Sequence, residues 1–312
     1  MITGGLDTRI AAAQLDSMFG LKPIMKRRGL EVASFEDPSN LLFEYDPKAD
    51  DQAQYNKYYD ALSERSFRRI VSFLANADGP RSKDDINKEW PYLSADKIDK
   101  VLKNAIDLGI IYSPGADQYA TVRKTNFGYT FEWYVAAACA KELESIVYWG
   151  INVKDLPSDY DVLLVRDGQL GYIECKSGKV RNISDEDLLN FFDRERRLSS
   201  QFSVFILDGV SDEKTQEMAN RILTMSRDKN KGLEYDFFSP MGSGGRCQLY
   251  IEEYKTFFRI MPINCFLLTV DERSISTALV ELYRFMTMVS DRNIRFENVA
   301  ARKEFGYIGE HH

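Results

Sequence analysis

The sequence predicts a mixed α/β fold in which a helix-rich part precedes a sheet-rich part. Two patterns predict it. Apolar residues recur at helical spacing over residues 58–108 and lead into a short hairpin, whereas residues 126–210 combine one helical stripe with several β-branched runs. With 312 residues, 44% of them hydrophobic and 29% charged, the chain is long enough for two domains with separate cores.

Residues 1–57 form an N-terminal extension in our division of the chain. A basic triplet, Lys26 to Arg28, is typical of solvated surface. A polar, acidic stretch follows over residues 46–51, and the apolar run Leu41–Tyr45 predicts a short strand.

Residues 58–125 predict a winged helix-turn-helix. An amphipathic helix ends at Asp78, Ser82 and Ser94 are in position to cap two further helices, and a turn at Pro114 separates two short strands that would form the wing. The third helix carries candidate nucleic-acid contacts at Lys97, Lys100 and Lys103. Because acidic residues alternate with these lysines, a dimerisation or docking role is an equally good interpretation of this unit.

Residues 126–312 form the second predicted domain, with C-terminal additions. A helical stripe over residues 131–139 precedes strands near residues 146–153, 160–165 and 169–176, and then a helix and a strand over residues 203–207. Asp167-Gly168 is a hairpin dipeptide between the second and third strands. The element order is therefore αβββαβ.

The hairpin brings together residue types that suit phosphodiester hydrolysis. Asp161 begins one strand, and Glu174 and Lys176 share one face of the next, because successive strand residues alternate faces. Two carboxylates could bind Mg²⁺ or Mn²⁺, and a nearby lysine could orient or deprotonate water and stabilise charge on phosphate. In the alternative interpretation, these three residues are an ordinary solvated sheet surface.

The spacing of Asp161, Glu174 and Lys176, within the sequence Ile-Glu-Cys-Lys, resembles the PD-(D/E)xK nuclease superfamily. The resemblance covers residues 126–210 and implies a restriction-endonuclease-like core. It also implies that Glu132, in the segment Gly-Tyr-Thr-Phe-Glu, joins Asp161 and Glu174 as a metal ligand. A winged helix followed by such a nuclease core is similar to the arrangement in CRISPR ancillary nucleases.

Composition excludes several other chemistries. The two histidines are His311 and His312, which look like the remainder of a purification tag, so histidine-dependent triads and zinc fingers are excluded for the rest of the chain. Four widely spaced cysteines follow no metal or disulfide pattern and fit a reducing cytoplasm. No apolar run is long enough to cross a bilayer.

The sequence therefore predicts a cytoplasmic metal-dependent endonuclease, with DNA favoured over RNA. A net charge of −7 does not favour nucleic-acid binding, but Lys179 and Arg181 lie near the predicted site and could provide a local basic groove. The helical run Asp193–Arg197 could contribute to that groove or be a salt-bridged helix face. We expect a homodimer and leave a protein partner or effector open. The alternative is a catalytically silent nucleic-acid-binding or scaffold protein.

Overall fold

The computed structural model describes residues 21–45, 52–156, 159–166, 168–177, 182–208, 212–227, 235–237, 245–247, 250–254, 257–261, 264–270 and 274–287. Lys179 and Arg181, two of the predicted nucleic-acid contacts, lie outside these residues.

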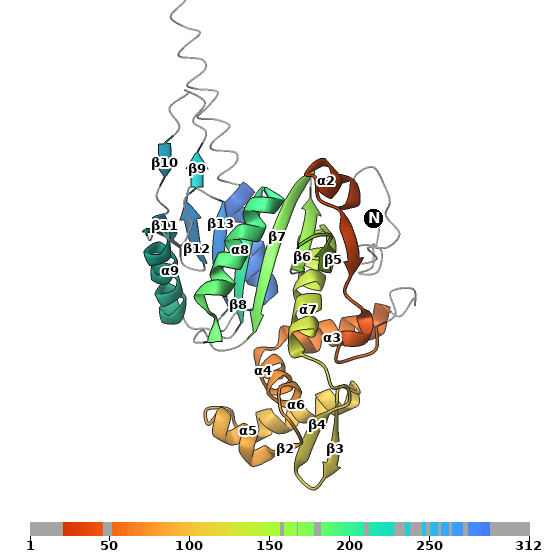
Figure 1. Ribbon diagram of the computed structural model, residues 1–312. Helices are drawn as coiled ribbons and strands as arrows, with labels where there is room; N and C mark the ends of the chain where they lie inside the picture. The colour runs from red at the N-terminus through yellow and green to blue at the C-terminus, as the bar shows by residue number, and fades with distance from the viewer. Residues whose placement is uncertain are drawn as a thin grey trace, which may run out of the picture.

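A mixed eight-stranded sheet lies at the centre of the described residues (Figure 1), with the strand order β1-β5-β6-β7-β8-β13-β12-β11. Strands β7, β8 and β13 are parallel to one another, and the other neighbours are antiparallel. The strands span β1 (Val32–Phe35), β5 (Ile146–Val153), β6 (Tyr160–Arg166), β7 (Gln169–Ser177), β8 (Phe202–Asp208), β11 (Tyr250–Glu253), β12 (Phe257–Met261) and β13 (Cys265–Val270). A separate hairpin pairs β9 (Tyr235–Phe237) with β10 (Gly245–Cys247).

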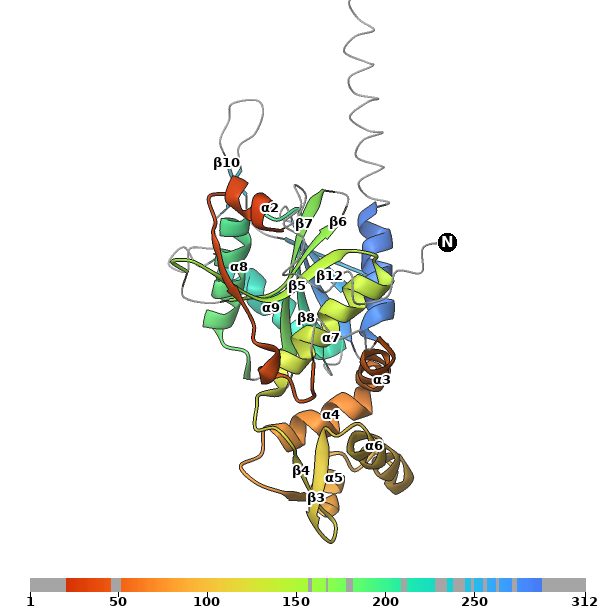
Figure 2. The same ribbon diagram turned by 90° about the vertical axis from the view of Figure 1, so that its right-hand side faces the viewer.

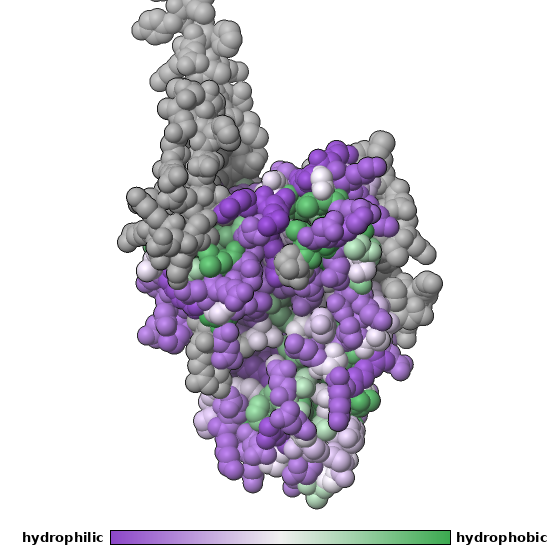
Figure 3. Space-filling view, viewed as in Figure 1, coloured by the Kyte–Doolittle hydropathy of each residue, from purple (hydrophilic) through white to green (hydrophobic). Residues whose placement is uncertain are grey.

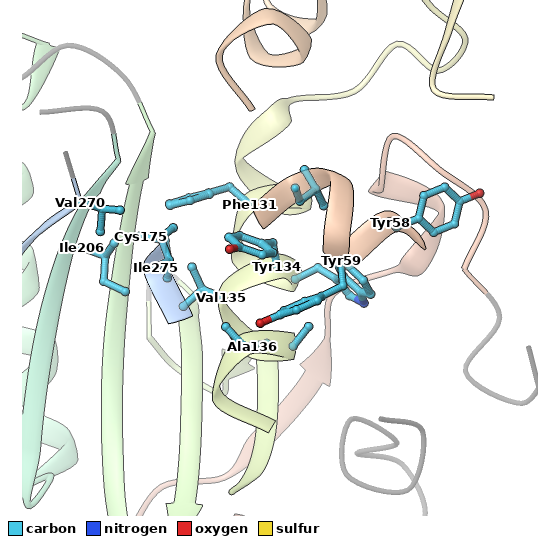
Figure 4. Close-up of a cluster of buried hydrophobic side chains, with 14 of the residues drawn as sticks. Tyr58, Tyr59, Phe131, Tyr134, Val135, Ala136, Cys175, Ile206, Val270 and Ile275 are labelled. Atoms are coloured by element: carbon cyan, nitrogen blue, oxygen red, sulfur yellow. The ribbon is translucent and has the colours of Figure 1, made fainter. Parts of the chain in front are cut away.

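Helices cover both faces of this sheet (Figure 2). On one face, helix α7 (Phe127–Glu142) packs against the strands, and α3 (Gln52–Ser63) and the helical residues 275–287 pack against the same hydrophobic cluster. On the other face lie α2 (Leu21–Arg27), α8 (Asp185–Leu198) and α9 (Asp212–Arg227). Figure 4 shows Val135 of α7 directed toward the strands that carry Cys175 and Ile206, with Tyr58 and Tyr59 of α3 on the other side of that helix.

The predicted αβββαβ order is present as α7, β5, β6, β7, α8 and β8. Each strand of the core is nearly continuously buried, as expected for strands covered on both faces. Gly168 adopts a φ of 75° in the β6–β7 turn, which a residue without Cβ tolerates at little cost. The fold class is therefore mixed α/β, as predicted.

The helices and hairpin predicted for the winged unit are also present. Helices α4 (Arg65–Ala75), α5 (Lys83–Glu89) and α6 (Ala95–Asp107) pack beside a three-stranded sheet of β2 (Arg81–Ser82), β4 (Gln118–Thr121) and β3 (Ile111–Gly115). Ser82 caps α5 through a reciprocal capping box with Asp85, and the Ser94 side chain caps α6. The predicted boundary after residue 57 falls inside helix α3, and the division into domains remains a prediction.

A buried ion pair joins this helical unit to the central sheet. Arg68 of α4 donates from Nε and one terminal nitrogen to the two carboxylate oxygens of Asp208, over 2.8 and 2.7 Å. Its other terminal nitrogen donates to the carbonyl oxygens of Leu62 and Ser63, and its guanidinium lies 5.4 Å from the ring centroid of Tyr134. The pair is buried and links α4 directly to the end of β8, so removal of one partner would leave a desolvated charge.

The prediction of a strand over Leu41–Tyr45 is wrong. A short 3₁₀ helix, η1 (Pro38–Asn40), precedes this segment, which has no regular structure, and the edge strand is β1 instead. Leu41, Leu42 and Phe43 are buried in the main hydrophobic cluster, and the Leu42 amide donates to Thr130 Oγ1 over 3.0 Å. Their apolar character therefore reflects burial as a loop, which periodicity cannot distinguish from a strand.

Hydrophilic residues cover most of the coloured face in Figure 3. Within the part of the chain that the structure describes, no helix is both long enough and apolar enough to cross a membrane.

Candidate active site

The β6–β7 hairpin places Asp161 and Glu174 beside each other. Val162 pairs with Ile173 in the antiparallel register, so Asp161 and Glu174 stand one position further along the two strands. The Cys175 amide donates to Asp161 Oδ2 over 2.7 Å. Both carboxyl groups are buried, with 7% of Asp161 and 2% of Glu174 exposed, so neither belongs to an ordinary solvated sheet face.

Glu174 is held between two cations. Lys176 Nζ lies 2.9 Å from Oε1, and a terminal nitrogen of Arg194 lies 2.7 Å from Oε2. The Tyr172 hydroxyl donates to Oε2 as well. These contacts confirm that Tyr172, Glu174 and Lys176 share a face, whereas Cys175 is buried in the cluster beneath α7 on the opposite face.

Glu132 projects from the middle of helix α7 and is buried. Its Oε2 has no hydrogen-bond partner among the described residues. Burial raises the pKa of Glu132 well above its ordinary value, and the negative charges of Asp161, Asp159, Glu174 and Glu36 raise it further. The structure therefore brings Glu132 into the electrostatic environment of the two strand carboxylates.

Burial and neighbouring charges also shift the pKa values of Asp161 and Lys176. Burial raises the pKa of Asp161 well above its ordinary value and the charge of Glu174 adds to this effect, although the Cys175 amide opposes it. Burial opposes the charge on Lys176, but the charge of Glu174 and its hydrogen bond outweigh burial and raise the lysine pKa. Lys176 is therefore an ammonium group in this arrangement, which suits charge stabilisation and orientation of water better than proton abstraction.

Two neighbours of the site, Asp159 and Glu36, were not predicted as site residues, whereas Arg194 belongs to the helical run that was predicted as a possible part of a basic groove. Arg194 follows Phe191 by three positions and precedes Leu198 by four, so a charge on the buried stripe of α8 was the available sequence signal. Glu36 approaches through folding of a distant segment and no local pattern identifies it, whereas Asp159 lies two positions before Asp161 in the sequence. The predicted salt-bridged face of α8 is present between Asp193 and Arg197, which lie 2.7 Å apart.

Gly150 allows the segment with Glu36 to approach strand β5 closely. It lies between the Trp149–Val162 and Ile151–Tyr160 pairs, opposite Asp161, and has a φ of +55°. A Cβ at this position would lie 2.2 Å from the Cβ of Glu36. A side chain here would therefore displace Glu36 or the strand.

The donor chemistry of the site fits a hard divalent cation. Carboxylate oxygens are the ligands that Mg²⁺ and Mn²⁺ prefer, and the partnerless Oε2 of Glu132 lies in a field of negative charge. Among the described residues, however, no three His, Cys, Asp or Glu side chains are already grouped around one point as metal ligands. Glu174 would have to exchange a bound cation for the metal.

The predicted contacts on α6 lie in the helical unit rather than in the hairpin. Lys100 and Lys103 are exposed, whereas Lys97 Nζ lies 2.5 Å from Glu64 Oε1. Asp99, on the same helix, pairs with Lys83 over 2.6 Å. This mixed surface does not distinguish nucleic-acid binding from docking.

No family model matches this chain, and no curated protein is significantly similar to it. The solved structures similar to it include protein VC1899 from Vibrio cholerae, at 14% identity and a TM-score of 0.39. They also include Can2 from Sulfobacillus thermosulfidooxidans in complex with cyclic tetra-adenylate, at 12% identity and a TM-score of 0.43. The match covers 64% of this chain with either protein, and 55% and 54% of those chains respectively, so the chain spans about half their length. At these values the similarity supports no conclusion about function.

Proposed function

We propose that this protein is a metal-dependent endonuclease that hydrolyses phosphodiester bonds, with DNA favoured over RNA. The observation that supports this most is the burial of three carboxylates, with Glu132 of α7 within range of the charges of Asp161 and Glu174 and with Lys176 paired to Glu174. Burial and neighbouring negative charge raise the pKa of Glu132 and of Asp161, and buried carboxylates of this kind are costly for folding and typical of sites that bind a cation.

Asp161, Glu174 and Glu132 would hold Mg²⁺ or Mn²⁺. A bound divalent cation supplies Lewis acidity toward a phosphate oxygen and lowers the pKa of bound water. Lys176, as an ammonium group, would donate hydrogen bonds to the attacking water or to a non-bridging phosphate oxygen. The Cys175 amide fixes the orientation of the Asp161 carboxylate through the hydrogen bond to Oδ2.

Cleavage of a mixed substrate panel tests this proposal. Single-stranded, duplex, supercoiled and branched DNA and an RNA would each be incubated with Mn²⁺ or with EDTA. We expect products only with Mn²⁺, and a loss of at least a hundredfold in rate for Lys176→Ala and Asp161→Asn, on the order of a positioned catalytic group. Lys214→Ala is the matched control, because Lys214 pairs with Glu217 on the exposed surface of α9. Products that survive EDTA or both site variants would contradict the proposal.

A catalytically silent nucleic-acid-binding or scaffold protein is the second candidate. The pairing of both Glu174 oxygens with Lys176 and Arg194 favours it, because this pairing satisfies the carboxylate without a metal. Thermal unfolding separates the two. A nuclease site should raise the unfolding temperature in Mn²⁺, and Asp161→Asn should abolish the increase, whereas a silent protein would show no increase.

We further propose that the protein acts in the cytoplasm and as a homodimer, which would allow both strands of a duplex to be cut. Sedimentation of the full chain measures the second property directly. A monomer at the concentrations that support cleavage would refute it.

A further inference from the structure

The guanidinium of Arg194 pairs with Oε2 of Glu174, the carboxylate oxygen that Lys176 does not contact. Its terminal nitrogen lies 2.7 Å from Oε2 and 3.3 Å from the Tyr172 hydroxyl oxygen, while Lys176 lies against Oε1. The Arg194 side chain is 15% exposed. One carboxylate therefore pairs with two cations at the centre of the candidate active site.

A metal ion and Arg194 compete for the same carboxylate. Glu174 Oε2 accepts from both Arg194 and the Tyr172 hydroxyl, which uses both of its lone pairs, so a divalent cation can coordinate Oε2 only if one of these donors moves. Lys176 Nζ also lies 3.7 Å from Asp187, a second carboxylate that keeps it in place. A cation on Oε2 would repel the charged guanidinium and not the neutral Tyr172 hydroxyl, so Arg194 is the donor that it would displace.

The helix that carries Arg194 is fixed, so displacement would move only its side chain. A capping box between Ser184 and Asp187 begins α8, and Phe191 and Leu198 on either side of Arg194 are buried in the core. A displaced guanidinium therefore stays within one side-chain length of Glu174. A guanidinium has a planar array of donors that matches two oxygens of a phosphate, which an ammonium group cannot do.

We propose that Arg194 is a phosphate-binding residue of this site, which leaves Glu174 and binds a substrate phosphate through its guanidinium when a divalent cation is present. This inference rests on the proposed nuclease function and assigns a substrate contact to it. In the metal-free protein Arg194 is therefore paired with Glu174, and it contacts phosphate only when both the divalent cation and the substrate are bound.

The salt dependence of binding tests this inference, because removal of one phosphate-binding group makes the plot of log Kd against log salt shallower by about 0.9 for duplex DNA and about 0.7 for a single strand. Binding of a fluorescent phosphorothioate oligonucleotide, which resists hydrolysis, would be measured with the full-length protein, in which Lys176 remains on Glu174 Oε1, with Mn²⁺ and with EDTA. Arg194→Gln, which keeps an amide donor for Glu174, would be compared with that parent. Arg197→Gln is the control, because it removes the same charge one turn away on the exposed face of α8.

We expect Arg194→Gln to reduce the slope by the equivalent of about one phosphate in Mn²⁺ and to leave it unchanged in EDTA. Any effect of Arg197→Gln should be the same in both conditions. Equal slopes for Arg194→Gln and its parent in Mn²⁺ would overturn the inference while leaving the nuclease proposal intact. Absence of binding by the parent would instead refute nucleic-acid binding and the inference with it.

Arg194→Lys provides a second variant that keeps a positive charge beside Glu174. We expect it to keep the slope in Mn²⁺ but to bind several-fold more weakly, because an ammonium group lacks the two-point contact. It should bind as its parent does in EDTA. Affinity equal to that of the parent in Mn²⁺ would overturn the role of the guanidinium, including in the case that Arg194→Gln does not fold.

Discussion

The buried pair between Arg68 and Asp208 provides the strongest prediction about stability. Asp208→Asn removes the negative charge and leaves the guanidinium of Arg68, whose side chain is 0% exposed, with neutral acceptors: the amide oxygen of the new side chain and the Leu62 and Ser63 carbonyls. Breaking a buried ion pair in this way costs about 3–5 kcal/mol, because the unpaired charge stays desolvated. We therefore expect a loss of that size in the free energy of unfolding.

Urea unfolding followed by circular dichroism and by tryptophan fluorescence would measure this loss. If the pair holds α4 against the sheet, both signals should shift together to a lower midpoint. The double variant Arg68→Met/Asp208→Leu should recover most of the stability, since hydrophobic replacements of buried ion pairs are often neutral.

Lys83→Ala is the matched control, because it breaks the surface pair with Asp99 and should change stability little. A change for Asp208→Asn as small as for Lys83→Ala would refute the reasoning. So would a double variant as unstable as the single one, because the loss would then not come from an unpaired charge.

Three further predictions follow from the described contacts. Gly150→Ala should destabilise the protein by more than the roughly 1–2 kcal/mol expected for a left-handed residue alone, because the new Cβ would meet Glu36. Gly168→Ala is the control, since Gly168 has a φ of +75° and open space around it, and this change should cost only the conformational free energy. Equal losses of stability in urea unfolding would contradict the close contact at Gly150. Burial raises the pKa of Cys139 from 9.0 to about 12, so the stability that its neutral thiol contributes should be complete below pH 9 and fall as the pH rises toward 12. Cys139→Ala should flatten that fall in unfolding measurements, and an unchanged slope would show that the thiol does not cause it. Thr130→Val should lower the free energy of unfolding by about 1–3 kcal/mol, because it leaves the buried Leu42 amide without its acceptor. Thr130→Ser keeps a hydroxyl and should cost less. Equal losses in calorimetry would show that packing, rather than the hydrogen bond, causes the loss of stability.

Much of the core could be predicted from the sequence because its signals are local. The β-branched runs of β5, β6 and β7 and the hairpin dipeptide depend on neighbouring residues, so their limits agree with prediction to within about one or two residues. The capping serines of α5 and α6 are equally local. The hairpin then fixes the spacing of Asp161, Glu174 and Lys176 without further information.

The rest of the site depends on contacts between distant segments. Glu36 lies against Gly150 and within range of Glu132 because β1 pairs with β5, and Arg68 meets Asp208 across 140 positions of the chain. A charged residue on an apolar helical stripe was the sequence signal for both Arg68 and Arg194. Periodicity shows that such a residue faces the core, but it does not show which acidic residue is its ion-pair partner.

The pairing of β1 with β5 bears on how shortened versions of this protein would behave. Val32, Ser34 and Phe35 pair along β5, a strand whose residues are largely buried and apolar. A fragment that starts at the predicted winged unit would lose β1 and expose the backbone donors and acceptors of β5 along an open edge. Open apolar edges recruit strands from other molecules, so such a fragment would tend to aggregate. Poor solubility of that fragment would then reflect a missing neighbour strand rather than an unstable core.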